Sequence, residues 1–273
     1  MEIAPLIHSR TLHCDFNPNF AVRPSDINVN WAMKNILLST SEVDILNGVR
    51  RLVVSDGKIS IAGIACNLRF FAEKYLSDVD AKKYFHDERG REVKIFLGFA
   101  FKGGSQNEFP DVDYSMLWNF FKETLAPVWE GEIVETVIVG YKTCQTKDFS
   151  AKINPVEKIN GIEFCETNEI DDEKLFKQCM AERRNFCSNA DQIKIVTSGE
   201  FDIISTTQSI INRYKSETEK KNPPPQTSSS PTASMQTKFH PRREIPRKPS
   251  KSKMLLIAAA IVIIATIILF VIR

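Results

Sequence analysis

Residues 49–66, VRRLVVSDGKISIAGIAC, contain the clearest fold signal in this chain of 273 residues. Two apolar runs, 49–54 and 59–66, flank the sequence Ser55-Asp56-Gly57-Lys58. An Asp-Gly pair supplies the positive φ that a tight turn between antiparallel strands requires. The segment therefore predicts a β-hairpin.

A second hairpin is predicted from residues 83–86 and 91–101, which flank the turn sequence DERG at 87–90. Large apolar residues alternate strictly in the longer arm, so they should share one face of a strand that covers the core. These residues are Val93, Ile95, Leu97, Phe99 and Phe101. Further strands are expected at residues 3–16, 133–141, 161–165 and 192–196.

Helical patterns lie between these strands. Asp113 and Asp171 are each expected to cap a helix, because an apolar stripe at helical spacing follows each of them. Weaker helical patterns occupy residues 26–38 and 206–214. Hairpins followed by helices, rather than strict alternation of strand and helix, favour an α+β domain with a mostly antiparallel sheet and packed helices. We expect this domain to occupy residues 1–216.

A second, independent signal lies at residues 254–272, MLLIAAAIVIIATIILFVI, which contain no charge, Pro or Gly. A helix of this length measures about 28 Å, close to the roughly 30 Å hydrocarbon core of a bilayer. It is predicted to be the one transmembrane helix of a tail-anchored, single-pass protein. Residues 217–253 before it are rich in Pro, Ser and Lys and poor in large apolar residues, so they are predicted to form a disordered basic linker.

The linker places a cluster of cations directly before the predicted membrane helix. The cluster comprises Lys238, Arg242, Arg243, Arg247, Lys248, Lys251 and Lys253. Because segments rich in Lys and Arg stay on the cytoplasmic side, the domain before them is expected in the cytoplasm. The same side chains are predicted to lie at the membrane surface and to bind anionic lipids of the bilayer. In the alternative, they only orient the helix during insertion.

Charge is divided unevenly along the chain. From residue 217 onward, ten Lys or Arg face three Glu, a net charge of +7, whereas the whole chain carries +2. Residues 1–216 therefore carry −5. A mildly acidic domain has no general attraction for phosphate backbones, so no nucleic-acid partner is expected. The six cysteines lack the compact spacing of a disulfide framework and are expected to be reduced thiols.

No catalytic or cofactor motif emerges from the remaining residues. His8, His13 and Cys14 cluster near the start of the chain, but no spaced partner accompanies them, so neither a metal nor a cofactor is predicted. Gly57-Lys58 and Gly103-Gly104-Ser105 contain residue types found in phosphate-binding loops, yet each lacks the rest of such a motif. Both are interpreted as turns.

Two functions of different classes remain. The first is a membrane-tethered binding, adaptor or signal-sensing module whose cytoplasmic domain recognises a protein or a small molecule. The second is a membrane-associated enzyme whose catalytic residues form no recognisable motif. A polar pocket with strongly perturbed titratable groups would favour the enzyme, and an exposed apolar patch rimmed by charge would favour the adaptor. A third hypothesis is an effector that acts through its transmembrane helix, where Ala258, Ala259 and Ala260 permit close helix approach.

Overall fold

The chain folds into an α+β structure with a mostly antiparallel mixed sheet and helices, as the sequence predicts. The computed structural model describes residues 1–15, 21–40, 48–76, 78–132, 135–150, 152–188 and 201–221, and the side chains of all of these except 37–40. These residues belong to one compact unit. The predicted strand at 192–196, the seven linker cations and the predicted membrane helix at 254–272 lie outside the described residues.

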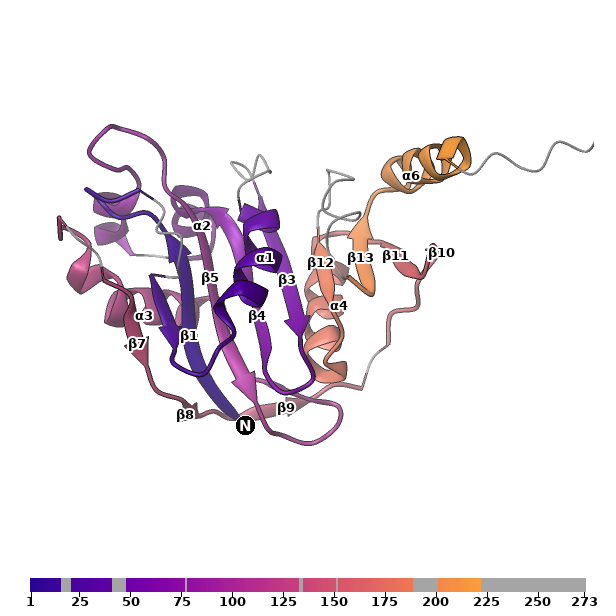
Figure 1. Ribbon diagram of the computed structural model, residues 1–273, viewed down its shortest axis with the longest axis horizontal. Helices are drawn as coiled ribbons and strands as arrows, with labels where there is room; N and C mark the ends of the chain where they lie inside the picture. Colours follow the sequence, from indigo (N-terminus) through magenta and orange to yellow (C-terminus); the bar gives the residue numbers. More distant parts are fainter. Residues whose placement is uncertain are drawn as a thin grey trace, which may run out of the picture. The chain divides into compact units, whose positions relative to one another are not determined.

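One large sheet organises the described part of the chain (Figure 1). Its strands are β1 (Glu2–Ser9), β2 (Val22–Pro24), β3 (Val49–Ser55), β4 (Ser60–Asn67), β5 (Lys94–Lys102), β7 (Val137–Val139), β8 (Lys142–Thr143), β10 (Glu157–Ile159), β11 (Ile162–Glu166), β12 (Phe186–Ser188) and β13 (Ile203–Thr206). They run in the order β10-β11-β13-β12-β3-β4-β5-β1-β2-β7, and β8 pairs with β1. The pairs β11–β13, β12–β13 and β2–β7 are parallel. A separate small sheet pairs β6 (Glu108–Pro110) with β9 (Thr146–Asp148).

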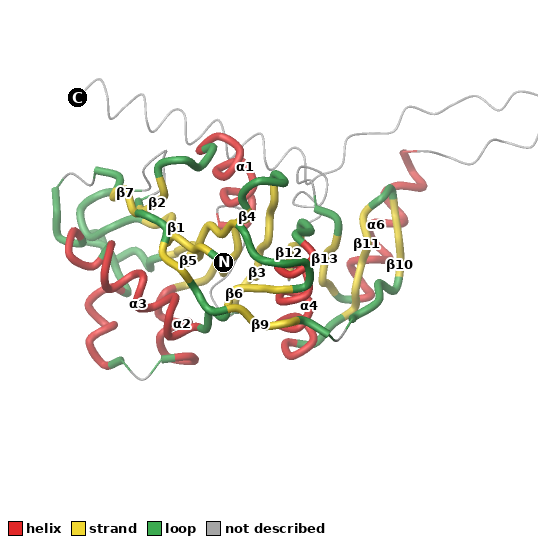
Figure 2. Tube along the Cα trace, turned by 90° about the horizontal axis from the view of Figure 1, so that it is seen from below, coloured by secondary structure: helices red, strands yellow, loops and turns green. Residues whose placement is uncertain are grey.

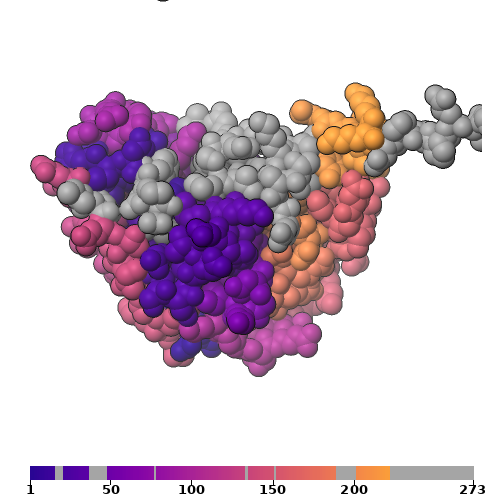
Figure 3. All heavy atoms as spheres, in the orientation of Figure 1, coloured from indigo at the N-terminus to yellow at the C-terminus, as the bar shows by residue number. Residues whose placement is uncertain are grey.

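Helices cover both faces of the large sheet. They are α1 (Val29–Thr40), α2 (Leu68–Tyr75), α3 (Tyr114–Thr124), α4 (Glu169–Glu182) and α6 (Gln208–Lys221), with the 3₁₀ helices η1 (Val79–Tyr84) and η2 (Ala126–Val128). Figure 2 shows α2, α3 and α4 on one face and α1 on the other, which matches two separate clusters of buried apolar residues. Figure 3 shows the indigo and violet atoms of α1 and the β3–β4 hairpin beside orange atoms from later in the chain, in keeping with the pairing of β3 with β12. No helix among the described residues is long and apolar enough to cross a membrane.

The first predicted hairpin is confirmed. Strands β3 and β4 pair antiparallel with Ser55 opposite Ser60. Gly57 in the turn has φ 87°, and the Asp56 carboxylate accepts hydrogen bonds from the backbone N–H groups of Lys58 and Ile59, both at 2.8 Å. Asp-Gly therefore fixes the turn through both a backbone conformation and a side-chain acceptor.

The second predicted hairpin is half right. The alternating residues of β5 all lie in one buried cluster, whereas Phe96 and Ala100 lie in the cluster on the opposite face. However, residues 79–84 form η1 rather than a strand, and only one bridge, between His86 and Glu92, joins the expected arms. The reason is that β1 and β4 already occupy both edges of β5.

Two glycines let the central strands approach closely. Gly63 of β4 lies opposite Gly98 of β5. A Cβ added at Gly63 would lie 2.5 Å from the carbonyl oxygen of Leu97 and 2.7 Å from the ring of Phe96. A side chain at this pair would therefore displace the backbone or the buried Phe96 ring.

The helix predictions are confirmed with one correction. The Asp113 carboxylate caps α3 by accepting from the Met116 N–H at 2.8 Å. The predicted cap at Asp171 is wrong, because Asn168 caps α4 by accepting from the N–H groups of Ile170 and Asp171, both at 3.0 Å. Asp171 instead lies in the first turn of the helix. Helix α6 continues through Lys221, five residues beyond the predicted end of the domain.

Candidate functional site

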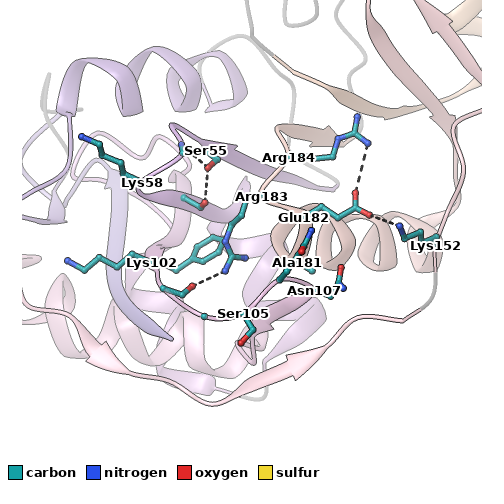
Figure 4. Close-up of a pocket in the computed structure, with 16 residues that line it drawn as sticks. Ser55, Lys58, Lys102, Ser105, Asn107, Lys152, Ala181, Glu182, Arg183 and Arg184 are labelled. Carbon is teal, nitrogen blue, oxygen red and sulfur yellow. Dashed lines mark hydrogen bonds and ion pairs between the residues drawn. The ribbon is translucent and has the colours of Figure 1, made fainter.

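A basic pocket opens where three separate segments meet, and its cavity volume is about 580 Å³. The turn between β3 and β4, the loop between β5 and β6, and the C-terminal end of α4 supply most of its lining (Figure 4). This volume lies within the range of small-molecule binding sites, roughly 300–1,000 Å³. We call it the basic pocket because its lining includes Lys58, Lys102, Lys152, Arg183 and Arg184.

The charge of the basic pocket contrasts with that of the domain. Glu182 is the single carboxylate among its described lining residues, against five cations. Residues 1–216 as a whole carry −5. Concentrating cations in one hollow of an acidic domain creates a local positive potential that attracts anions.

Arg183 lies at the centre of the pocket because of the way α4 ends. Its backbone is left-handed, with φ 54° and ψ 35°, a conformation usually taken by glycine at this position. The Arg183 N–H donates to the Met180 carbonyl at 3.4 Å, and the Arg184 N–H donates to the Cys179 carbonyl at 3.0 Å. These two bonds form a Schellman motif, which reverses the chain and directs Arg183 toward the β5–β6 loop.

The Arg183 side chain is held by backbone carbonyls. Nη1 donates to the carbonyl oxygens of Glu108, at 3.2 Å, and Met180, and Nη2 donates to that of Gly103 at 3.0 Å. The guanidinium carbon lies 4.7 Å from the centre of the Phe101 ring. Three of the five guanidinium N–H donors are used in these bonds, and no described carboxylate forms an ion pair with Arg183. Burial lowers its pKa, against the attraction of the nearby Glu108 carboxylate.

The β5–β6 loop shapes the pocket without supplying its own anion-binding backbone. Gly103 and Gly104 have φ values of 73° and 88°. The Ser105 N–H donates to the Glu108 carboxylate at 3.0 Å, so an acidic side chain of the chain itself already occupies this loop. A Cβ at Gly104 would lie 3.5 Å from Nη2 of Arg183. That contact would be ordinary, whereas Cε of Met1 would lie only 2.5 Å away, so Gly104 makes room for the Met1 side chain, and both glycines supply the positive φ of the loop.

The remaining cations form two groups on opposite sides of Arg183 (Figure 4). Lys58 and Lys102 extend to one side, and Lys152 and Arg184 lie on the other. Lys58 is exposed, and within the described residues its ammonium group forms no ion pair, whereas its backbone N–H donates to Asp56. The Lys102 ammonium is already engaged, because it lies 3.0 Å from the Asp26 carboxylate and 3.7 Å from the centre of the Tyr141 ring.

Ion pairs at the pocket are weak enough for an incoming anion to compete with them. Glu182 lies 3.8 Å from Lys152 and 3.9 Å from Arg184. Arg184 also bonds to Glu163 at 3.1 Å. Lys152 is 71% exposed, and such surface pairs contribute only about 0–1 kcal/mol. A phosphate group carries more charge than one carboxylate and could replace these contacts.

The basic pocket contains few side chains of the types that most often transfer protons. No His, Cys, Asp or Tyr occurs among its described lining residues. Two of its three serine hydroxyls are paired with each other, because Ser60 Oγ donates to Ser55 Oγ at 3.0 Å, and Ser105 is the third. General acid–base catalysis needs a positioned group that titrates near the working pH. Glu182 is the one carboxylate of the described lining, and it lies near Lys152 and Arg184, so the described residues suit the binding and orientation of an anion.

A second cluster of charge lies near the N-terminal end of α4, beneath the sheet. Arg51 Nη1 donates to Asp172 at 2.8 Å and Nη2 donates to the Tyr114 hydroxyl at 2.6 Å, while the Arg51 N–H donates to Ser188 Oγ at 2.7 Å. The side chains of Arg51 and Asp172 are 2% and 3% exposed. Burial raises the pKa of the Asp172 carboxyl against the hydrogen bonds from Ser205, Arg51 and Ser188. This closed cluster holds α4 on the sheet.

An apolar groove follows α3 and has a volume of about 560 Å³. Met116, Phe120 and Val139 supply apolar surface, with Glu123 and Lys142 among the charged residues that line it. A groove of this kind, apolar with charged residues beside it, fits the adaptor hypothesis. By contrast, the other aromatic residues of this region, Trp118, Phe121 and Trp129, are buried.

The two histidines and the cysteine that cluster near the start of the chain do not form a ligand set in the described structure. His8 is buried in β1, His13 Nδ1 lies 2.8 Å from Glu88, and Cys14 Sγ donates to the Glu132 carbonyl at 3.0 Å. The described part of the chain contains no group of three or more metal-binding side chains. All six cysteines are free thiols, and burial raises the pKa of Cys187 to about 11.

The basic pocket is not predicted from the sequence, although two of the segments that line it stand out there. Gly57-Lys58 and Gly103-Gly104-Ser105 are turns, as predicted, but the fold brings both to one pocket. Lys152 and the pair Arg183-Arg184 were not predicted as site residues. No local signal marks the end of α4, because Arg183 occupies the position where glycine is usual.

No protein-family model matches this chain, and neither a curated protein nor a solved structure matches it. The function is therefore argued from the geometry and charge of the basic pocket.

Proposed function

We propose that this protein is a membrane-tethered binding module whose cytoplasmic domain takes an anionic ligand in the basic pocket. The observation that carries the proposal is the concentration of five cations against Glu182 in one cavity of an acidic domain. Such a cavity raises the local concentration of anions and holds them with charge-assisted hydrogen bonds. The ligand would contact the β3–β4 turn, the β5–β6 loop and the end of α4 together. Binding could therefore change how these segments are held, as an adaptor or a sensor requires.

The tether in this proposal is the apolar segment 254–272, with the cytoplasmic side set by the seven cations that precede it. A flexible chain of the length of residues 222–253 has an end-to-end distance of about 30 Å. The domain would therefore work close to the bilayer surface, where anionic lipids attract the basic linker.

Binding is better supported than catalysis for this pocket. A catalytic site for an anionic substrate would need a nucleophile or a base beside the cations. The described lining offers serine hydroxyls without a histidine, and its one carboxylate lies near two cations. We accordingly expect the protein to bind and release the ligand without altering it chemically.

The test is equilibrium dialysis of the full chain in mild detergent with labelled pyrophosphate. We expect saturable binding that weakens steeply with salt, and a loss of about tenfold or more in affinity for Arg184→Gln. A matched control is Arg69→Gln, which removes the same charge from an exposed position on α2. Absence of saturable binding at millimolar pyrophosphate, or equal loss in both variants, would overturn the proposal.

The membrane component is tested separately by deleting residues 254–272. The full chain should stay with membranes through carbonate extraction, and the deleted form should be released while still binding pyrophosphate. Retention of the deleted form on carbonate-washed membranes would contradict a single anchor at this segment.

A further inference from the structure

The arrangement of cations in the basic pocket limits the ligands that can use all of them. Figure 4 shows Lys58 and Lys102 on one side of Arg183, and Lys152 and Arg184 on the other. Because the two groups extend to opposite sides of Arg183, a single phosphate group has fewer of these cations within hydrogen-bonding distance than a larger anion has. A ligand with several phosphates offers a separate anionic group to each side of Arg183.

The rest of the lining offers little for an apolar or aromatic part of a ligand. The uncharged residues of the lining are mainly Ser, Gly, Gln and Asn, with Ala181. Phe101, the one aromatic residue of the described lining, is 0% exposed and lies beneath the Arg183 guanidinium at 4.7 Å. A nucleobase usually stacks on an exposed aromatic or apolar surface, and the described lining presents none.

We infer that the basic pocket binds a multiply phosphorylated polar molecule, of the class of a phosphorylated polyol or a short polyphosphate, and recognises it through its phosphates alone. This inference rests on the proposed anion-binding function and narrows its ligand class. The same chemistry can come from a soluble molecule or from the headgroup of a phosphorylated lipid, which the membrane tether would bring within reach. Hydroxyl groups of a polyol can bond to the Ser and Asn side chains between the two groups of cations.

The experiment compares four probes on the full chain in mild detergent by calorimetric titration. The probes are inorganic phosphate, tripolyphosphate, ATP and inositol trisphosphate. We expect tripolyphosphate and inositol trisphosphate to bind about 100-fold more tightly than phosphate, because they engage both groups of cations. ATP should bind within about threefold of tripolyphosphate, because the base finds no stacking partner.

The variant Lys58→Gln/Lys152→Gln removes one exposed cation from each side of Arg183. Its affinity for tripolyphosphate should fall about tenfold or more, with the affinity for inorganic phosphate changed much less. The matched control Lys82→Gln/Lys174→Gln makes the same change of charge on exposed residues outside the pocket and should stay within about twofold of the unmodified chain.

A further arm distinguishes the two sources of the ligand. Glycerophosphoinositol bisphosphate, the deacylated headgroup of a phosphorylated lipid, carries one phosphate as a diester, as in the lipid. Binding as tight as that of inositol trisphosphate would support a lipid headgroup, and much weaker binding would support a soluble ligand. Both results agree with the inferred phosphate recognition.

Two results would overturn the inference while leaving the proposed function intact. One is ATP binding about tenfold or more tightly than tripolyphosphate, since the base would then contribute. The other is inorganic phosphate binding as tightly as tripolyphosphate, since one phosphate site would then suffice. If none of the four probes binds, the proposed anion-binding function itself is wrong.

Discussion

The two ends of α4 use arginine in opposite ways. Near the N-terminal end, Arg51 is buried and is paired with Asp172 and Tyr114. At the C-terminal end, Arg183 is fixed by carbonyl groups, and no described carboxylate is paired with it. The carboxylate of Asp172 neutralises the charge of Arg51 within the fold. The carbonyl groups around Arg183 hold its guanidinium in place without neutralising it, and two of its N–H donors stay available.

This difference separates structural charge from binding charge. Removing one partner from a buried pair leaves the other charge desolvated, so the Arg51 cluster cannot exchange its partner for a ligand. The basic pocket is bordered by partly exposed pairs whose partners can be replaced at small cost. Arg51 of β3 and Arg183 after α4 therefore have different roles because their surroundings differ.

The largest effect is expected at the buried pair. Asp172→Ala should lower the free energy of unfolding by about 3–5 kcal/mol, because Arg51 would remain buried without its carboxylate. Chemical unfolding followed by circular dichroism measures this loss. The control is Glu173→Gln, since Glu173 is 39% exposed and lies 3.9 Å from Arg51, so its change should stay within about 0.5 kcal/mol. Equal effects of both variants would contradict the structural role of the pair.

A smaller effect is expected at the other end of α4. Arg183→Ala should lower the free energy of unfolding by about 1–2 kcal/mol, because it removes the side-chain hydrogen bonds to three carbonyl groups while a non-glycine residue stays in the left-handed conformation. Arg183→Gly should cost about 1 kcal/mol less, since glycine adopts this conformation freely. Thermal unfolding of both variants measures the difference. Glycine being the more destabilising of the two would show that backbone conformation matters little here.

The third prediction concerns the stability of the fold in acid, which depends on the carboxyl group of Asp87. The fold lowers the pKa of Asp87, whereas it raises that of Asp172. Burial opposes ionisation of Asp87, but hydrogen bonds from Arg91 and Arg10 lower its pKa to about 2. Because the folded pKa is lower than the unfolded one, Asp87 stabilises the fold above pH 4, and this contribution is lost as pH falls toward 2. Asp87→Asn should lose less stability than the unmodified chain between pH 4 and pH 2. Parallel losses in both proteins would contradict this assignment.

The smallest effect on stability is expected at the pocket. Lys152→Gln should change the free energy of unfolding by no more than about 0.5 kcal/mol, because its ion pair with Glu182 is highly exposed. Its affinity for tripolyphosphate should nevertheless fall measurably. Denaturant titration and calorimetry on the same preparation test both parts. A large loss of stability would indicate that the pair is structural.

Local patterns in the sequence predicted much of the sheet, and long-range contacts explain the rest. The Asp56-Gly57 turn and the alternating residues of β5 depend on neighbours in sequence, so both predictions are confirmed. The pairing of β5 with β1 joins Ile7 to Leu97, and no local pattern encodes such a partner. Without that partner, residues 83–86 were interpreted as the missing strand.

The basic pocket could not be predicted for a similar reason. Lys58, Lys152 and Arg183 come from distant segments, and each is an ordinary surface residue within its own segment. Their proximity depends on the Schellman turn after α4 and on the β5–β6 loop, which are tertiary features. Asn168 was missed as the cap of α4 because Asp171 and Asp172 also match the pattern of a helix start.

The central claim is that anions bind at the C-terminal end of α4 and not at the buried Arg51 cluster. Amide chemical shifts of the isotope-labelled full chain in detergent, recorded during a tripolyphosphate titration, test it directly. We predict saturable shifts at Lys58, Ser105 and Arg184, with the amides of Arg51 and Asp172 unchanged. Shifts at Arg51 and Asp172 without changes at the basic pocket, or no saturable shift in the described residues, would contradict the account.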